Sequence, residues 1–98
     1  MTIESFRNRE TEDVAYGRKN KRTLKLLPSD VHFPAYKKLV FLNNIETLAS
    51  LRAWPGLKLE PLRGDRKEQW SIRINDKYRI CFRFNQGQAY DVEITDYH

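Results

Sequence analysis

Side chains that can transfer protons or neutralise charge gather in the second half of this chain. The sequence ends on Asp96, Tyr97 and His98, and Glu60 adds another carboxylate. Three arginines stand among them: Arg63, Arg73 and Arg79. RNA cleavage without a metal ion needs such a set, because a base removes the 2′-hydroxyl proton, cations stabilise the transition state and an acid protonates the departing 5′-oxygen. The residue types therefore fit ribonuclease chemistry if the fold brings them together.

Composition restricts the partners and cofactors of the chain. Its 98 residues carry 18 Lys and Arg against 13 Asp and Glu, a net charge of +5, which favours a polyanionic partner. The single cysteine, Cys81, and two distant histidines, His32 and His98, predict no disulfide framework, no metal site and no cofactor. No apolar run approaches the roughly 18 residues of a membrane span, and the first residues lack a signal-peptide pattern. We expect a cytoplasmic protein that makes no membrane contact.

The first half of the chain has helical spacing, and residues 1–98 are expected to form a single domain. Residues 8–20 carry acids early and bases late, as a helix favours, and Gly17 weakens or ends that helix. Apolar residues recur at threes and fours over 30–52, which predicts one long helix. The opening residues TIESF could form a strand, and the basic segment 17–22 is expected to be exposed.

The second half has the two-residue period of strands. Alternating stretches occur at LKLEPL, WSIRI, YRICFRF and AYDVEIT. Opposed residues point to the same face, so the apolar sides of WSIRI and YRICFRF match only across a three-residue loop at 75–77. That loop pairs Ile72 with Ile80 and Trp70 with Phe82. The same test pairs Phe84 with Tyr90 across 85–89.

Cations dominate the polar side of this predicted sheet. Arg73, Lys77, Arg79 and Arg83 share that side with Cys81, and they could bind phosphate groups of RNA. Alternatively, an uncovered sheet face simply requires polar residues. In the preceding Gly64-Asp65-Arg66 turn, Arg66 could bind phosphate or pair with Asp65. The thiol of Cys81 has no histidine nearby in sequence to activate it as a nucleophile.

Two strings carry a resemblance to a known family. They are LEPLRGDRKEQWSIRINDKYRICFRF and AYDVEITDYH, and they are similar to the HigB toxins, also called the plasmid maintenance killer family, of the RelE/ParE superfamily. The resemblance is strong over 57–98 and weaker over the helical half.

The resemblance implies both a fold and an activity. The fold is α+β, a RelE-like microbial RNase fold with two N-terminal helices packed on a curved, mainly antiparallel sheet. The activity is that of a type II toxin: ribosome-dependent cleavage of mRNA, neutralised by a HigA-type helix-turn-helix antitoxin that would link the toxin to operator DNA. Carried over by position, the active-site arginine falls on Arg79, a basic RNA-binding or catalytic residue on Arg63, and the terminal group on Asp96, Tyr97 and His98.

The sequence departs from the family pattern at Glu60. Some members have a histidine there, so a candidate acid or base is lost. A glutamate can act as the base if its surroundings set its pKa, or His98 could carry more of the proton transfer. The departure also keeps two other functions open: a toxin of this fold that acts by binding, on DNA gyrase or on ribosome assembly, or a protein that acts mainly by modulating operator binding through its antitoxin.

Overall fold

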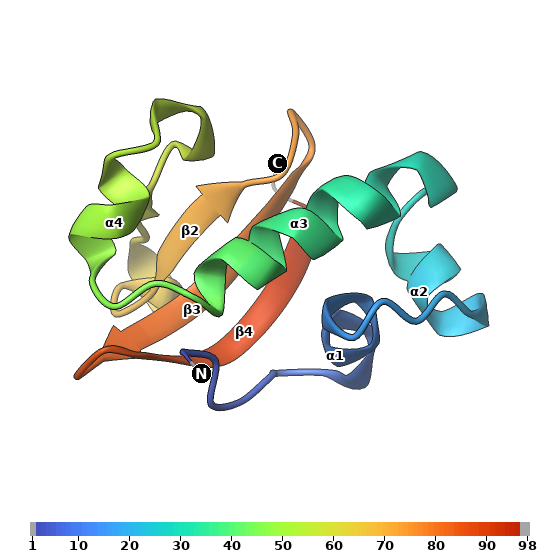
Figure 1. Ribbon diagram of the computed structural model, residues 1–98, viewed down its shortest axis with the longest axis horizontal. Helices are drawn as coiled ribbons and strands as arrows, with labels where there is room; N and C mark the ends of the chain where they lie inside the picture. The colour runs from blue at the N-terminus through green and yellow to red at the C-terminus, as the bar shows by residue number, and fades with distance from the viewer. Residues whose placement is uncertain (1, 97–98) are drawn as a thin grey trace.

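The computed structural model describes residues 2–96, and it has the predicted α+β class (Figure 1). Its α-helices are α1 (Arg9–Ala15), α2 (Lys21–Leu26), α3 (His32–Leu42) and α4 (Leu48–Arg52). Its strands are β1 (Glu60–Pro61), β2 (Trp70–Arg73), β3 (Tyr78–Asn85) and β4 (Gln88–Asp96). The four strands form one antiparallel sheet in chain order. Short 3-10 turns occur at Ser29–Val31, Pro55–Leu57 and Gly64–Arg66.

Helix α3 lies across one face of the sheet and covers the core (Figure 1). Its Ala35, Leu39 and Leu42 are buried in one apolar cluster with sheet residues Ile80 and Phe82. The prediction of a single helix over 30–52 is wrong, because α3 ends at Leu42 and α4 begins only at Leu48. The helical half therefore has four α-helices within residues 2–96 rather than two.

A second helix, α2, begins at the end of the basic segment 17–22, which is exposed as predicted except at half-buried Asn20. Helix α1 ends before Gly17, whose φ of 75° lies in the left-handed region that glycine adopts without strain. Asn20 then caps α2: its side chain accepts from the backbone N–H of Thr23, and the Thr23 hydroxyl accepts from the backbone N–H of Asn20. The two short helices pack against each other at one end of the helical layer.

The hairpin between β2 and β3 has the predicted register. Trp70 pairs with Phe82 and Ile72 with Ile80, so both apolar sides face α3. The backbone N–H of Ile74 donates to the carbonyl of Tyr78 across the loop, at 2.9 Å. Register could be calculated here because a one-residue slip would have exposed the apolar side of a whole strand.

The predicted pairing of Phe84 with Tyr90 is wrong. The turn contains only Gln86 and Gly87, both with positive φ, so Phe84 pairs with Ala89. A β-bulge follows, in which Asp91 adopts a φ of 52° and β4 contributes one extra residue. The bulge returns Val92 and Ile94 to the core, while Ala89 takes the buried place expected for Tyr90.

The opening residues lie parallel to β4 as an incomplete strand. Isolated bridges join Ile3 to Ala89 and Phe6 to Val92. The Glu4 backbone N–H donates to the carbonyl of Ala89 at 2.8 Å, and the Ser5 hydroxyl accepts from the backbone N–H of Asp91 at 2.9 Å. Across residues 2–96, no helix has the length and apolar character that crossing a membrane requires.

Candidate active site

Arg79 is the most enclosed of the predicted cationic site residues, with 8% of its surface exposed. It alternates with core residue Ile80 along β3, so it points to the face of the sheet opposite α3. Its Nε donates to the hydroxyl of Ser71 on β2 at 2.8 Å, and its Nη2 donates to the backbone carbonyl of Lys58 at 2.6 Å. These contacts, which we call the Arg79 clamp, fix the plane of the guanidinium group.

Lys58 takes part in the clamp through its backbone rather than its side chain. It has φ 47° and ψ 57°, a left-handed conformation in which a residue with a Cβ is strained by about 1–2 kcal/mol. Strained backbone of this kind concentrates at functional sites, where the surrounding structure maintains it.

Glu60 lies beside Arg79, as the sequence hypothesis requires. Its carboxylate is 3.4 Å from Nη1 of Arg79, and its side chain is half exposed. Strand β1 brings it there, because Glu60 pairs with Ser71 of β2. An accessible carboxylate next to a clamped arginine can accept a proton from a substrate whose phosphate the arginine holds.

Asp96 ends β4, the edge strand opposite β1, at the end of the sheet where β3 begins. The preceding residue, Thr95, pairs directly with Arg79, and Asp96 pairs with Tyr78. The carboxylate of Asp96 lies 3.7 Å from Nζ of Lys77. Tyr97 and His98 lie outside the described residues, so their predicted roles stay predictions.

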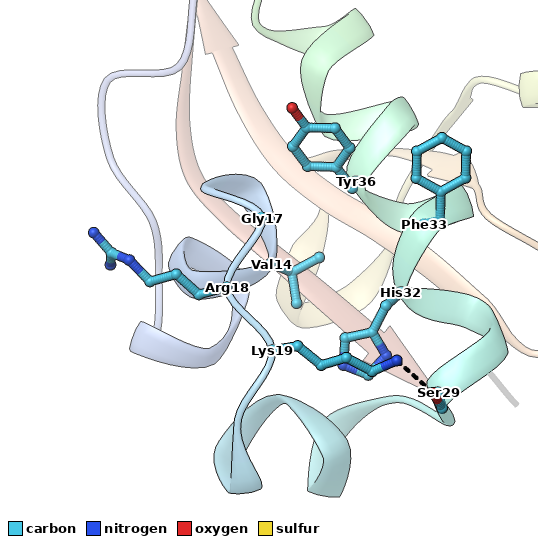
Figure 2. A pocket seen from close by; sticks show the side chains of 8 residues that line it. All are labelled: Val14, Gly17, Arg18, Lys19, Ser29, His32, Phe33 and Tyr36. Atoms are coloured by element: carbon cyan, nitrogen blue, oxygen red, sulfur yellow. Dashed lines mark hydrogen bonds between the residues drawn. The ribbon is translucent and has the colours of Figure 1, made fainter.

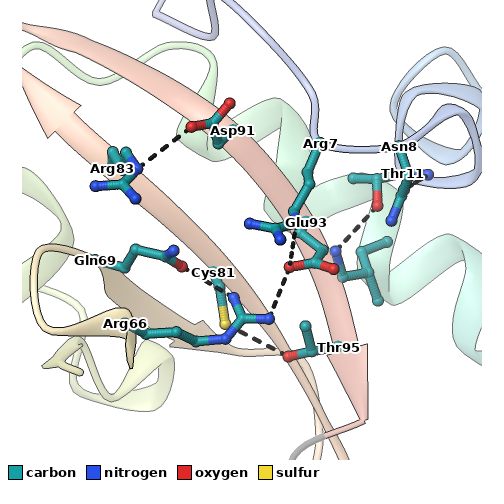
Figure 3. A network of polar contacts seen from close by, with 11 residues as sticks. Arg7, Asn8, Thr11, Arg66, Gln69, Cys81, Arg83, Asp91, Glu93 and Thr95 are labelled. Atoms are coloured by element: carbon teal, nitrogen blue, oxygen red, sulfur yellow. Dashed lines mark hydrogen bonds and ion pairs between the residues drawn. The ribbon is translucent and has the colours of Figure 1, made fainter. Parts of the chain in front are cut away.

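The remaining cations of this face do not form a bare positive surface. Arg66 donates to Gln69 and to Glu93, each at 3.0 Å, and Arg7 approaches the same Glu93 oxygen at 3.8 Å (Figure 3). The Arg66 contacts attach the Gly64–Arg66 turn to β4 over Cys81, which is 1% exposed with its Sγ 3.4 Å from the Thr95 hydroxyl. The thiol of Cys81 is therefore buried, although its strand position placed it on the polar face of the sheet.

The outer cations of the face are also opposed by carboxylates. Arg83 lies 3.1 Å from Glu68 and 3.3 Å from Asp91, and Arg73 pairs with Asp76. Arg63 is exposed, and in residues 2–96 its side chain makes no hydrogen bond or ion pair. Phosphate binding by Arg66, Arg73, Lys77 or Arg83 would therefore require each to exchange a carboxylate for the phosphate, whereas Arg63 would not.

Comparison with known proteins identifies the family. A family model described as the RelE-like toxin of type II toxin-antitoxin system HigB matches residues 5–98. The chain belongs to this family. The sequence-based recognition of a HigB toxin of the RelE-like superfamily is confirmed.

Two curated relatives carry HigB names. The Endoribonuclease HigB of Proteus vulgaris is 49% identical over 41 residues, a match that spans 42% of this chain and 45% of the relative. The Toxin HigB-1 of Vibrio cholerae serotype O1 is 35% identical over 65 residues, which covers 66% of this chain and 68% of the relative. Among solved structures, a YoeB/ParE toxin from Agrobacterium tumefaciens aligns over 100% of this chain and 99% of its own, with 16% identity and a TM-score of 0.49.

Sequence reasoning missed both partners that orient Arg79 in this HigB-family chain. Ser71 stands in the WSI motif, on the same side of its strand as Arg73, so strand period alone could have placed it beside Arg79. No sequence signal pointed to the Lys58 carbonyl, because lysine has no preference for the left-handed backbone conformation that this residue adopts.

Proposed function

We propose that this chain is the toxin of a type II toxin–antitoxin system and that it acts as a ribosome-dependent mRNA endoribonuclease. The single observation that carries the proposal is the clamped Arg79, with the Glu60 carboxylate 3.4 Å away and the end of β4 paired alongside. The family match and the name of the Proteus relative support the same activity.

In the proposed reaction, Arg79 binds the scissile phosphate and stabilises the charge of the transition state. Its guanidinium is already oriented by Ser71 and Lys58, so little reorganisation is needed as charge develops. Glu60 or Asp96 removes the 2′-hydroxyl proton, and His98 or Tyr97 protonates the departing 5′-oxygen. Arg63 and the outer cations contact neighbouring phosphates.

The proposed reaction is metal-independent, because arginine supplies the charge stabilisation that a metal ion would otherwise give. We place the protein in the cytoplasm with the ribosome and mRNA, and we propose a HigA-type helix-turn-helix antitoxin as its inhibitor. Through that antitoxin the toxin would bind operator DNA indirectly.

The test is to induce the wild-type chain, Arg79→Ala and His98→Ala in parallel in cells and to sequence the 5′ ends of mRNA. We expect growth arrest with new codon-phased cuts in the wild type and loss of both in the two variants. Arg79→Lys is the matched control, because it keeps the charge but loses the fork that the clamp orients, and it should restore only part of the cleavage.

Growth arrest without new cuts would overturn the nuclease proposal. The gyrase and ribosome-assembly alternatives would then be separated by measuring DNA replication and ribosomal subunit profiles. Full toxicity of correctly folded Arg79→Ala would leave the family intact and reject the assigned active site.

A further inference from the structure

One short segment of the chain is densely basic. Residues 17–27 contain five cations and no carboxylate, and we call this segment the α2 arm; the cations are Arg18, Lys19, Lys21, Arg22 and Lys25. Since the chain has 18 basic and 13 acidic residues in all, the remainder contains thirteen of each and is neutral. The arm is therefore a stretch in which positive charge is not diluted by acidic residues, whereas residues 52–83 mix nine basic with four acidic residues.

The charges of the arm are more available than those of the sheet. Within residues 2–96, no carboxylate lies within ion-pair distance of Lys21, Arg22 or Lys25, and all three are exposed. Arg18 pairs with Asp13 at 3.1 Å, but its side chain is 60% exposed. Arg66, Arg79 and Arg83 of the sheet face have carboxylate partners, so the arm holds more unpaired positive charge with which to attract a polyanion.

An aromatic pocket of about 340 Å³ adjoins the arm (Figure 2). Arg18 and Lys19 line one side, and Phe33 and Tyr36 of α3 line the other. Phe33 is 64% exposed, an unusual position for a large apolar ring, and it is stacked at 20° on Tyr36. Lys37 adds a cation 5.1 Å from the centre of the Phe33 ring.

His32 gives this pocket an unused hydrogen-bonding atom. The ring is 9% exposed, and Nδ1 lies 3.0 Å from the carbonyl of Pro28, which can only accept, so Nδ1 carries a proton. Nε2 is buried and has no hydrogen-bond partner in the part of the chain that the structure describes. His32 lines the pocket, so Nε2 is an atom of the pocket wall that no described protein group satisfies.

We propose that the α2 arm and the adjoining pocket form a second RNA-binding surface, which takes single-stranded RNA. Phosphates of the strand contact the cations of the arm, and an unstacked base lies on the exposed ring of Phe33. This surface belongs to the helical layer, whereas Arg79 points to the opposite face of the sheet. The choice of RNA as the ligand rests on the proposed function. The arm and pocket would then be an RNA-docking site separate from the cleavage site.

RNA fits this surface better than an acidic protein segment does. The surface combines a run of cations with an exposed, stacked aromatic pair, which is the pairing that single-strand binders use for backbone and base. An acidic peptide would use the cations but would leave the flat ring of Phe33 without a stacking partner.

The experiment measures binding of a labelled single-stranded RNA of about 16 nucleotides, the length of a large single-strand site, by fluorescence anisotropy over a range of salt. The double variant Lys21→Ala/Arg22→Ala should lower the slope of log affinity against log salt by about 1.4, since each lost contact to single-stranded RNA contributes about 0.7. Phe33→Ala should weaken binding about tenfold without changing the slope.

The control is Arg9→Ala/Arg52→Ala, which removes the same charge from exposed positions outside the arm. Its slope should equal that of the wild type. An equal loss in this control, or an unchanged slope in the arm variant, would overturn the proposal.

A second probe, polyglutamate, tests the acidic-protein alternative. Loss of polyglutamate binding with unchanged RNA binding in the arm variant would show a protein dock and overturn the proposal. The anisotropy assay measures RNA binding and does not require cleavage. A chain that cuts no mRNA would therefore refute the proposed function without changing the conclusion about RNA binding by the arm.

Discussion

At the scale of single residues, the site depends on how one buried guanidinium is oriented. Arg79 is 8% exposed, so its N–H groups must find partners inside the protein, and Ser71, Lys58 and Glu60 supply them. Of these, Ser71 is buried with it, whereas the Glu60 side chain is half exposed.

Removing the Ser71 hydroxyl should therefore misalign Arg79 without removing it. We expect Ser71→Ala to lower kcat for ribosome-bound mRNA about ten- to a hundredfold with little change in KM, because the cation is present but poorly positioned. The unpaired Nε–H should also cost about 1–3 kcal/mol of folding stability, measured by urea unfolding.

Thr95→Val is the matched control for Ser71→Ala, since it removes a hydroxyl on the neighbouring strand that contacts Cys81 instead of Arg79. A kcat loss as large in Thr95→Val would show that the effect is general to this face.

Glu60 has two possible roles that one substitution separates. If it is the base, Glu60→Gln should lower kcat by about a hundredfold, since the amide keeps the size but cannot accept the proton. If it only holds Arg79, Glu60→Gln should cleave normally and bind RNA more tightly, because a competitor for the guanidinium is gone. We expect the first result, measured as single-turnover cleavage on programmed ribosomes.

At the scale of elements, a buried carboxylate holds the α2 arm on the helical layer. Asp13 of α1 accepts from the Asn20 amide and from Arg18, each at 3.1 Å, and Asn20 is the residue that caps α2. The Asn20 hydrogen bond first, and then Arg18, hold the pKa of Asp13 below its usual 3.8. The ionised carboxylate is therefore the form that the fold stabilises.

This pKa shift predicts a pH window for stability. The folded pKa is lowered, so the contribution of Asp13 is complete above about pH 3.8 and is lost as the pH falls through the folded value. Asp13→Asn should be less stable than the wild type in urea at neutral pH, and the difference should close only below pH 3.8. A difference that closes near neutrality would contradict the Asp13 assignment.

The elements also show which parts of the fold were predictable. The β2–β3 register followed from matching apolar sides, and strand period alone placed Arg73 and Arg79 on the face opposite α3. The β3–β4 register failed because a two-residue turn and the bulge at Asp91 shift pairing in opposite directions, and a bulge at an aspartate leaves no trace in the alternation. The prediction of one helix over 30–52 failed because the apolar pattern continues past Asn43 and Asn44. The chain nevertheless leaves the helix there, and α4 begins only at Leu48.

At the scale of the whole molecule, the beginning of the chain depends on its last strand. Residues 2–6 form backbone hydrogen bonds with Ala89 and Val92 of β4. They thereby give β4 a partner on its otherwise free edge. The charge distribution is also a property of the whole chain, because the α2 arm carries five cations with no carboxylate.

Removing one backbone hydrogen bond between residues 2–6 and β4 tests how much this junction contributes to folding stability. Glu4→Pro removes the N–H that donates to Ala89, and it should lower the free energy of unfolding by about 1–3 kcal/mol. Glu4→Ala keeps that N–H and loses only the exposed contact with Gln88, so it should lie within about 0.5 kcal/mol of the wild type. Equal stability of the two variants would mean that the junction is dispensable.

The parallel pairing of residues 2–6 with β4 also sets an order in time. A ribosome makes residues 2–6 before it makes residues 88–96, so the opening segment emerges with no partner to pair with. Arg79 is likewise synthesised before Thr95, its neighbour on β4. A nascent chain that lacks β4 therefore has neither a closed sheet edge nor a finished site. For a protein proposed to attack translation, this order delays activity until β4 has been synthesised and has folded onto the sheet.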